Sequence, residues 1–171
     1  MRRSLATTAL ATAALATGIS APADARKVKD LWATVNVCDT PKSPNKMGVR
    51  ARMPGDGTRN RMYMRFTAQY RTGGKWKVVG GRGRSKWLLA GTARRRWQEV
   101  GYTFGIDAPK PGTSYVLRGL VQFQWRDKAT RKVVRRTHRF TARGHPTGSD
   151  GQPRNYSAGR CRVETPAPAN P

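Results

Sequence analysis

Residues 61–71 read R-M-Y-M-R-F-T-A-Q-Y-R, and apolar and polar side chains alternate along the whole stretch. A period of two residues is typical of a β-strand with one buried and one wet face, so Met62, Met64 and Phe66 are expected to point inward. The next residues, 72–75, read T-G-G-K, and a Gly-Gly pair suits the positive φ angles of a tight hairpin. The stretch therefore predicts a long strand that turns directly into another.

The same alternation recurs along the chain, whereas a helical period does not. Expected strands fall near 33–37, 47–53, 61–71, 76–78, 87–89, 100–106, 115–125 and 134–140. Short strands separated by Pro, Gly, Asn and Asp indicate an all-β fold, an antiparallel two-sheet sandwich of about 7–8 short strands.

The connection at 106–115 reads I-D-A-P-K-P-G-T-S-Y. It resembles the strand connection of fibronectin type III and immunoglobulin-like domains, in which a Tyr folds back onto the loop as the tyrosine corner. Tyr115 matches that position, and the resemblance covers roughly residues 100–125. It implies an immunoglobulin-like sandwich. The inter-sheet Cys pair of that family has no counterpart, because Cys161 lies beyond the last expected strand.

Two cysteines, Cys38 and Cys161, are the only ones in the chain. In an exported protein an even count indicates a disulfide, and closing so long a loop would stabilise the fold by about 4–5 kcal/mol. The alternative is a pair of free buried thiols. A structural metal site needs about four Cys or His ligands, and with only two His besides we expect no metal and no cofactor.

The N-terminus has the features of an export signal. Arg2 and Arg3 precede an uncharged Ala/Leu/Thr-rich run, and small residues at 21–25 fit a cleavage site. The alternative, a membrane anchor, needs about 20 mainly apolar residues. We expect a bacterial-type signal peptide at 1–25, no transmembrane span, and a secreted or cell-envelope protein outside the cytoplasm.

The rest of the chain divides by composition. Residues 26–143 carry the strand pattern and form the expected sandwich domain. From Gly144 the apolar residues thin out and Gly, Pro, Ser and Asn dominate. We expect an irregular strap at 144–163, pinned by the disulfide, and a disordered Pro/Ala tail at 164–171.

Charge is the strongest signal. The 171 residues hold 34 Lys+Arg against 9 Asp+Glu, for a net charge of +25. Arginine binds phosphate and carboxylate bidentately, so we expect a binding or structural module that contacts an anionic polymer or surface. Ligands would be a cell-wall polymer, anionic lipid headgroups or extracellular nucleic acid. The hypothesised site consists of Arg94, Arg95, Arg96, Arg131, Lys132, Arg135, Arg136 and Arg139.

Two alternatives remain open at this level. The charge could be incidental, arising from codon bias or a need for solubility. The chain could then be a protein-interaction module that binds a partner at a sheet edge or loop. It could also be a small hydrolase using His145 and Asp150, but acid–base catalysis usually needs a rigid constellation of His or carboxylates. Because these two residues fall in an expected loop, we expect no enzyme.

Overall fold

A computed structural model describes residues 30–145 and 147–167. The expected signal peptide and the last residues of the expected tail lie outside this range. The elements are β1 (Trp32–Thr40), β2 (Ser43–Pro54), β3 (Arg61–Thr72), β4 (Lys75–Val78), β5 (Leu88–Thr92), β6 (Trp97–Gly105), β7 (Thr113–Arg126), β8 (Val133–Phe140), the 3-10 turn η1 (Gly148–Asp150) and β9 (Cys161–Thr165). The described residues contain no α-helix, which confirms the all-β prediction.

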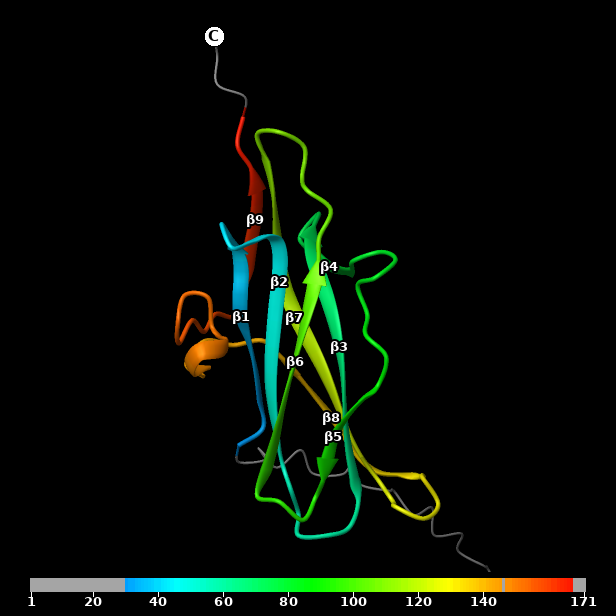
Figure 1. The fold of residues 1–171 in the computed structure, drawn as a ribbon. Helices are drawn as coiled ribbons and strands as arrows, with labels where there is room; N and C mark the ends of the chain where they lie inside the picture. Colours follow the sequence, from blue (N-terminus) through cyan, green and yellow to red (C-terminus); the bar gives the residue numbers. More distant parts are fainter. Residues whose placement is uncertain (1–29, 146, 168–171) are drawn as a thin grey trace, which may run out of the picture.

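Two antiparallel sheets form the layers of the molecule (Figure 1). The smaller sheet, sheet A, has the order β1-β2-β6. The larger one, sheet B, is built around β3 and β7, which pair along most of their length. Each long strand has two short neighbours on its other side: β5 and β4 pair with successive parts of β3, and β9 and β8 with successive parts of β7. Sheet B therefore offers a long outer surface.

The core lies between the sheets and is made from the alternating apolar residues of the strands. Met62, Met64 and Phe66 of β3 are fully buried, as expected. Phe123 and Trp125 of β7, which pair with Met64 and Met62, are fully buried as well. Burial of such side chains contributes about 1.5–3 kcal/mol each. Because side chains alternate along a strand, the residues that stand between these buried ones on β3 and β7 point outward from sheet B.

The hairpin between β3 and β4 has the expected turn. Gly73 and Gly74 have φ angles of 53° and 74°, the left-handed conformation at both central positions that a two-residue hairpin requires and that glycine adopts without steric cost.

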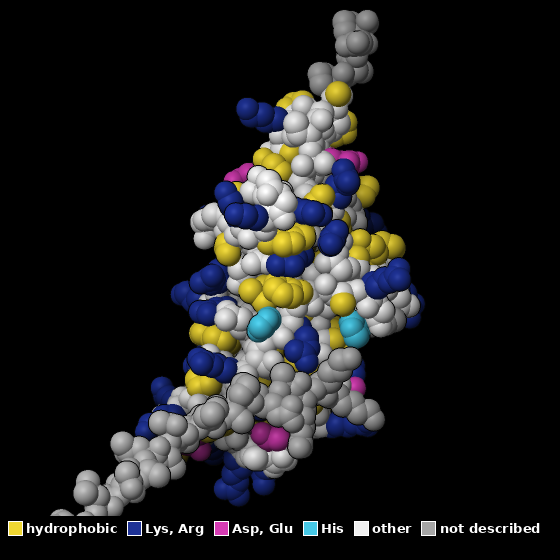
Figure 2. All heavy atoms as spheres, turned by 180° about the vertical axis from the view of Figure 1, so that it is seen from behind, with side chains coloured by type: hydrophobic (Ala, Val, Ile, Leu, Met, Phe, Trp, Pro, Cys, Tyr) yellow, Lys and Arg dark blue, Asp and Glu magenta, His cyan; other side chains and the backbone are white. Residues whose placement is uncertain are grey.

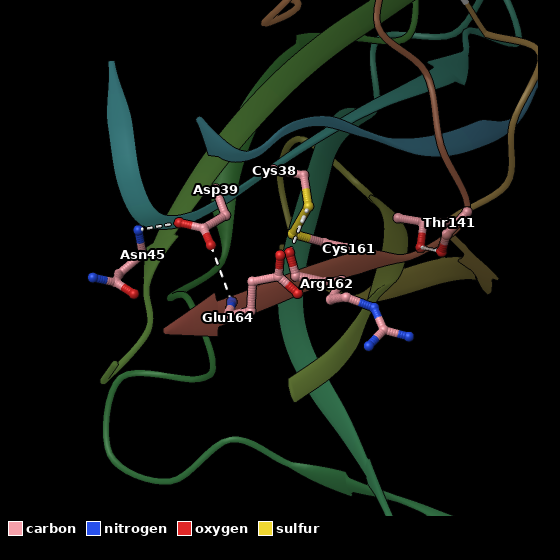
Figure 3. Close-up of a disulfide and its surroundings, with 8 residues drawn as sticks. Cys38, Asp39, Asn45, Thr141, Cys161, Arg162 and Glu164 are labelled. Atoms are coloured by element: carbon pink, nitrogen blue, oxygen red, sulfur yellow. Dashed lines mark hydrogen bonds between the residues drawn. A yellow bond between two sulfur atoms is a disulfide. The ribbon is translucent and has the colours of Figure 1, made fainter. Parts of the chain in front are cut away.

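The disulfide joins the two sheets (Figure 3). Cys38 lies on β1 of sheet A, and Cys161 opens β9, which pairs with β7 of sheet B. The carboxylate of Asp39 accepts hydrogen bonds from the backbone N–H groups of Asn45 (2.7 Å) and Glu164 (3.1 Å), which fixes β9 beside the β1–β2 turn. The predicted disulfide is confirmed. Sequence analysis placed Cys161 beyond the last strand, whereas it begins a ninth strand.

This ninth strand moves the expected boundaries. The irregular segment ends at about residue 160 rather than 163, and residues 164 and 165 belong to β9 rather than to a tail. Within β9, the buried residues are Cys161 and Val163. Two alternating positions are too few to give a detectable period in the sequence.

The irregular segment lies along β1. Val35 and Ala158 exchange backbone hydrogen bonds of 2.9 and 3.0 Å. The hydroxyls of Thr34 and Ser157 lie 2.8 Å apart, and the Asn36 amide donates to the carbonyl of Asp150 at 2.7 Å. The segment, which we call the strap, therefore covers outward side chains of β1.

Tyr115 does not form the expected tyrosine corner. The connection before β7 is held by Thr113, whose N–H and hydroxyl both donate to the carbonyl of Lys110 at 2.9 and 2.6 Å. Tyr115 is 38% exposed, and we find no hydrogen bond of its hydroxyl within the described residues. The strand already begins at Thr113, so Tyr115 stands inside it, opposite Val163 of β9.

Candidate binding face

The outward side chains of sheet B form one continuous surface, because directly paired residues of adjacent strands point to the same side. Its members on the strands include Arg61, Tyr63, Arg65, Thr67, Gln69, Trp76, Arg118, Leu120, Gln122, Gln124, Arg126, Arg136, His138 and Phe140. Trp87, Arg84 and Arg160 adjoin them. We call this surface the basic face. In Figure 2, blue Lys/Arg side chains alternate with yellow hydrophobic ones over the middle of the molecule.

Arg118 is held between two aromatic rings. Its guanidinium carbon lies 4.3 Å from the ring centre of Trp76 and 3.9 Å from that of Phe140. Its Nε donates to the Oε1 of Gln69 at 2.9 Å. Stacking and the amide contact together fix the plane of the guanidinium and leave its other N–H donors available to a ligand.

Arg65 and Arg126 share the indole of Trp87. Their guanidinium carbons lie 4.6 and 5.2 Å from its ring centre. Arg65 donates Nε and Nη2 to Gln122 Oε1 at 2.9 and 2.8 Å, and Arg126 donates the same pair to Gln124 Oε1 at 2.9 and 2.7 Å. Each cation is oriented by a neutral amide where a carboxylate would have neutralised it.

The basic face lacks negative charge over its length. Outward positions of β3 from 61 to 69, of β7 from 118 to 126 and of β8 from 136 to 140 hold no Asp or Glu. Burial lowers the pKa of Arg65 from its ordinary value, and the charges of Arg84 and Arg126 lower it further. Burial also lowers the pKa of Arg118, with a further effect from Arg160. These cations repel one another without compensation, which an anionic ligand would relieve.

Two hollows lie along this surface. One, of about 530 Å³, is lined by polar groups of Arg65, Gln122, Arg136 and His138 beside Trp87. Another, of about 320 Å³, lies at the end of the sheet. Its lining residues are Arg59, Arg61, Thr92, Arg94 and Lys128. Arg61 pairs across the strands with Arg126, so the positive surface continues from the first hollow to the second.

The outer side of sheet A also carries arginines, but there they are neutralised. Arg50 Nε donates to Glu99 Oε2 at 2.8 Å and Arg52 Nε to Glu99 Oε1 at 2.7 Å. Arg50 also pairs with Asp150 of the strap. Glu99 keeps only 13% of its side chain exposed between the two guanidiniums. Outward arginines thus have two different environments on the two sheets.

The structure separates the basic residues that sequence analysis grouped. On β8, Arg136 faces outward opposite Gln124, whereas Arg135 and Arg139 point to the other side of the strand. Arg135 lies over the Trp125 ring at 4.7 Å. Of the remaining ones, Arg131 and Lys132 lie in the β7–β8 turn and Arg94, Arg95 and Arg96 in the β5–β6 turn, where Arg94 joins the end hollow.

The residues named for a hydrolase have other contacts. The ring of His145 stacks on Trp32 with centroids 4.9 Å apart and planes 5° apart. Burial lowers the pKa of His145, and the charge of Arg52 lowers it further. Asp150 pairs with Arg50. Both residues thus attach the strap to the outer side of sheet A.

The centre of the basic face, namely Arg118, Arg126 and the glutamines that orient the cations, was not among the residues predicted from the sequence. The alternate positions 118, 120, 122, 124 and 126 carry Arg, Leu, Gln, Gln and Arg, so four of the five outward residues are polar, which is the signal available in the sequence. Recognising the site requires the strand register that places Gln122 opposite Arg65. These residues are 57 positions apart, so no local sequence pattern reveals their pairing.

Comparison of the chain with known protein families, curated proteins and solved structures returned no match. Among the described residues, no helix has the length and apolar character needed to cross a membrane.

Proposed function

We propose that this protein is a binding module that holds an anionic polymer along the basic face, outside the cytoplasm. The observation that carries the proposal is the row of arginines on sheet B, oriented by aromatic rings and glutamine amides and without an acidic partner at the outward positions. Because these arginine side chains are already oriented, less side-chain entropy is lost when a ligand binds.

The cost of this arrangement supports the proposal. Charged side chains are usually scattered or paired on a surface, as Arg50 and Arg52 are with Glu99. On the basic face, burial lowers the pKa of Arg65 and of Arg118, and the like charges of neighbouring arginines lower it further. Shifted pKa values of charged groups in a hollow of the surface are more common at functional sites than elsewhere.

An extracytoplasmic location fits the same proposal. The disulfide between Cys38 and Cys161 suits an oxidising compartment, and the sequence of residues 1–25 predicts a signal peptide. We also propose the finer assignment to the immunoglobulin-like class and a bacterial source; two antiparallel sheets joined by a disulfide support the former.

Titration of labelled inorganic polyphosphate at several salt concentrations tests the proposal. Binding that uses about five phosphate contacts should weaken roughly 100-fold over a fourfold rise in salt, because condensed counterions are released. Gln122→Glu places a carboxylate beside Arg65 and should weaken binding about ten-fold or more, the equivalent of one charge-assisted contact.

The matched control is Thr103→Glu, which makes the same charge change at an exposed position on sheet A. It should alter affinity little. Equal losses in the two variants, or no binding of polyphosphate at low salt, would overturn the proposal.

A further inference from the structure

The chemistry of the basic face, taken as the binding site proposed above, also restricts the ligand. Arginine guanidiniums already stack on its aromatic rings: Arg118 on Trp76, Arg65 on Trp87, and Arg126 on Tyr63. The guanidinium carbon of Arg126 lies 4.3 Å from the Tyr63 ring centre. A nucleobase or sugar ring would have to displace a cation from such a ring in order to stack on it. Rings in this arrangement position the cations, unlike the open aromatic platforms of single-strand binders.

The polar groups of the face offer mainly donors. The Oε1 atoms of Gln69, Gln122 and Gln124 accept arginine N–H groups, so the groups that these amides can still offer to a ligand are mainly N–H donors. Sugar hydroxyls and base edges present both donors and acceptors, and a protein that reads them needs acceptors as well. A face rich in donors suits a ligand whose recognisable atoms are acceptors only.

Positive charge is also closely spaced. The outward stretch of β7 from Arg118 to Arg126 spans about 27 Å at ~3.4 Å per residue. Arg61, Arg65, Arg84, Arg118, Arg126, Arg136 and Arg160 lie along or beside it. The face therefore offers about one positive charge for every 4 Å of its length. Such a density suits a chain that carries a charge on every repeat unit.

We infer that the ligand is a linear phosphate-linked chain without bases, recognised through its non-bridging oxygens by the guanidiniums of the basic face. Phosphate oxygens accept two parallel N–H bonds from one guanidinium, and each unit of such a chain carries charge. The chain could be a phosphoanhydride, as in inorganic polyphosphate, or a phosphodiester, as in poly(glycerol phosphate). Both present the same oxygens to the face.

A panel of probes with equal numbers of charges tests this inference on the whole mature protein. The probes are inorganic polyphosphate, poly(glycerol phosphate), oligo(dT), an abasic phosphodiester strand of the same length, heparin fragments and polygalacturonate. Oligo(dT) and the abasic strand should bind equally, whereas stacking of even one base would favour oligo(dT) about five-fold or more. Both phosphate chains should bind more tightly than heparin and polygalacturonate, and the tighter of the two identifies the linkage.

The variants Gln122→Glu and Thr103→Glu separate the possible failures. Tighter binding of oligo(dT) than of the abasic strand, or tightest binding of heparin or polygalacturonate, overturns the ligand assignment. If Gln122→Glu weakens binding of the preferred probe and Thr103→Glu does not, the proposed function stands. Absence of binding by every probe, or equal losses in both variants, overturns the proposed function together with the inference. Unchanged thermal midpoints in both variants establish that the losses arise in the bound state.

Discussion

Arg65 directs two N–H donors to one oxygen of Gln122, the residue opposite it in the β3–β7 pairing. The contact joins a charged group to a neutral one, so it orients the guanidinium and leaves its charge uncompensated. Its geometry depends on the planar fork of arginine, which lysine lacks.

Arg65→Lys should therefore weaken polyphosphate binding about five-fold or more while the salt dependence stays nearly constant, because charge is kept and a bidentate contact is lost. Binding isotherms at two salt concentrations measure both quantities. Arg154→Lys, in the exposed strap, is the control and should bind as the unaltered protein does. A parallel loss in both variants would contradict a localised site.

The β8 strand allows the sequence-based hypothesis to be separated from the structural one. Arg136→Ser should lower the log–log salt slope by about 0.7–0.9, the value for one phosphate contact. Arg135→Ser and Arg139→Ser should leave the slope unchanged, because these side chains point to the other side of the strand. An equal reduction of the salt slope by the substitutions at all three positions would indicate that the whole β7–β8 hairpin is the site.

Glu99 should matter for stability rather than for binding. Glu99→Gln leaves Arg50 and Arg52 without their shared carboxylate. We expect a loss of about 1–2 kcal/mol in the free energy of unfolding, below that of a fully buried pair because both guanidiniums are partly exposed. Urea unfolding measures it. A stability equal to that of the unaltered protein would show that solvent screens this pair completely.

His145 should make the stability of the fold dependent on pH. Its pKa is lowered in the folded protein, first by burial, where its ring stacks on Trp32, and then by the charge of Arg52, so the unfolded chain binds the proton more readily. Its contribution is complete above the unfolded-state pKa of about 6.5 and is lost as pH falls through the lower folded value. Nearby Glu99 and Asp150 are paired with arginines.

Urea midpoints between pH 7.5 and 5 measure this effect. His145→Gln should flatten the pH dependence in that range. His138→Gln, on the opposite sheet, is the matched control and should retain it. A steeper dependence in His145→Gln would reverse the sign of the expected linkage.

Local patterns were sufficient to predict much of the fold. The alternation at 61–71 predicted which side of β3 is buried, and Gly73-Gly74 predicted the hairpin, because both depend on residues adjacent in sequence. Two lone cysteines allowed one intramolecular pairing, and the disulfide followed. The tyrosine corner at Tyr115 was wrong because the strand begins two residues earlier than the resemblance implied.

Features that depend on distant pairing were not accessible in the same way. The outward arginines of both sheets look alike in the sequence, yet Glu99 neutralises Arg50 and Arg52 while Gln122 leaves Arg65 charged. Only the register of β2 with β6 and of β3 with β7 distinguishes the two cases. Strand β9 was likewise missed because its burial comes from β7 and the disulfide rather than from a pattern of its own.

The strap across β1 has a consequence for how many copies of the protein would bind to one polymer chain. On the broad side of sheet A, Glu99 and Asp150 pair with Arg50 and Arg52, whereas Arg65, Arg118 and Arg126 of the basic face have amide and aromatic partners instead of acidic ones. A particle that is adhesive on one broad side lines up along a polymer and lowers its charge, but it does not tie two strands together. Mixtures with a long polyanion should therefore remain fluid as the polymer becomes coated, whereas a particle adhesive on both sides would turn them into a gel.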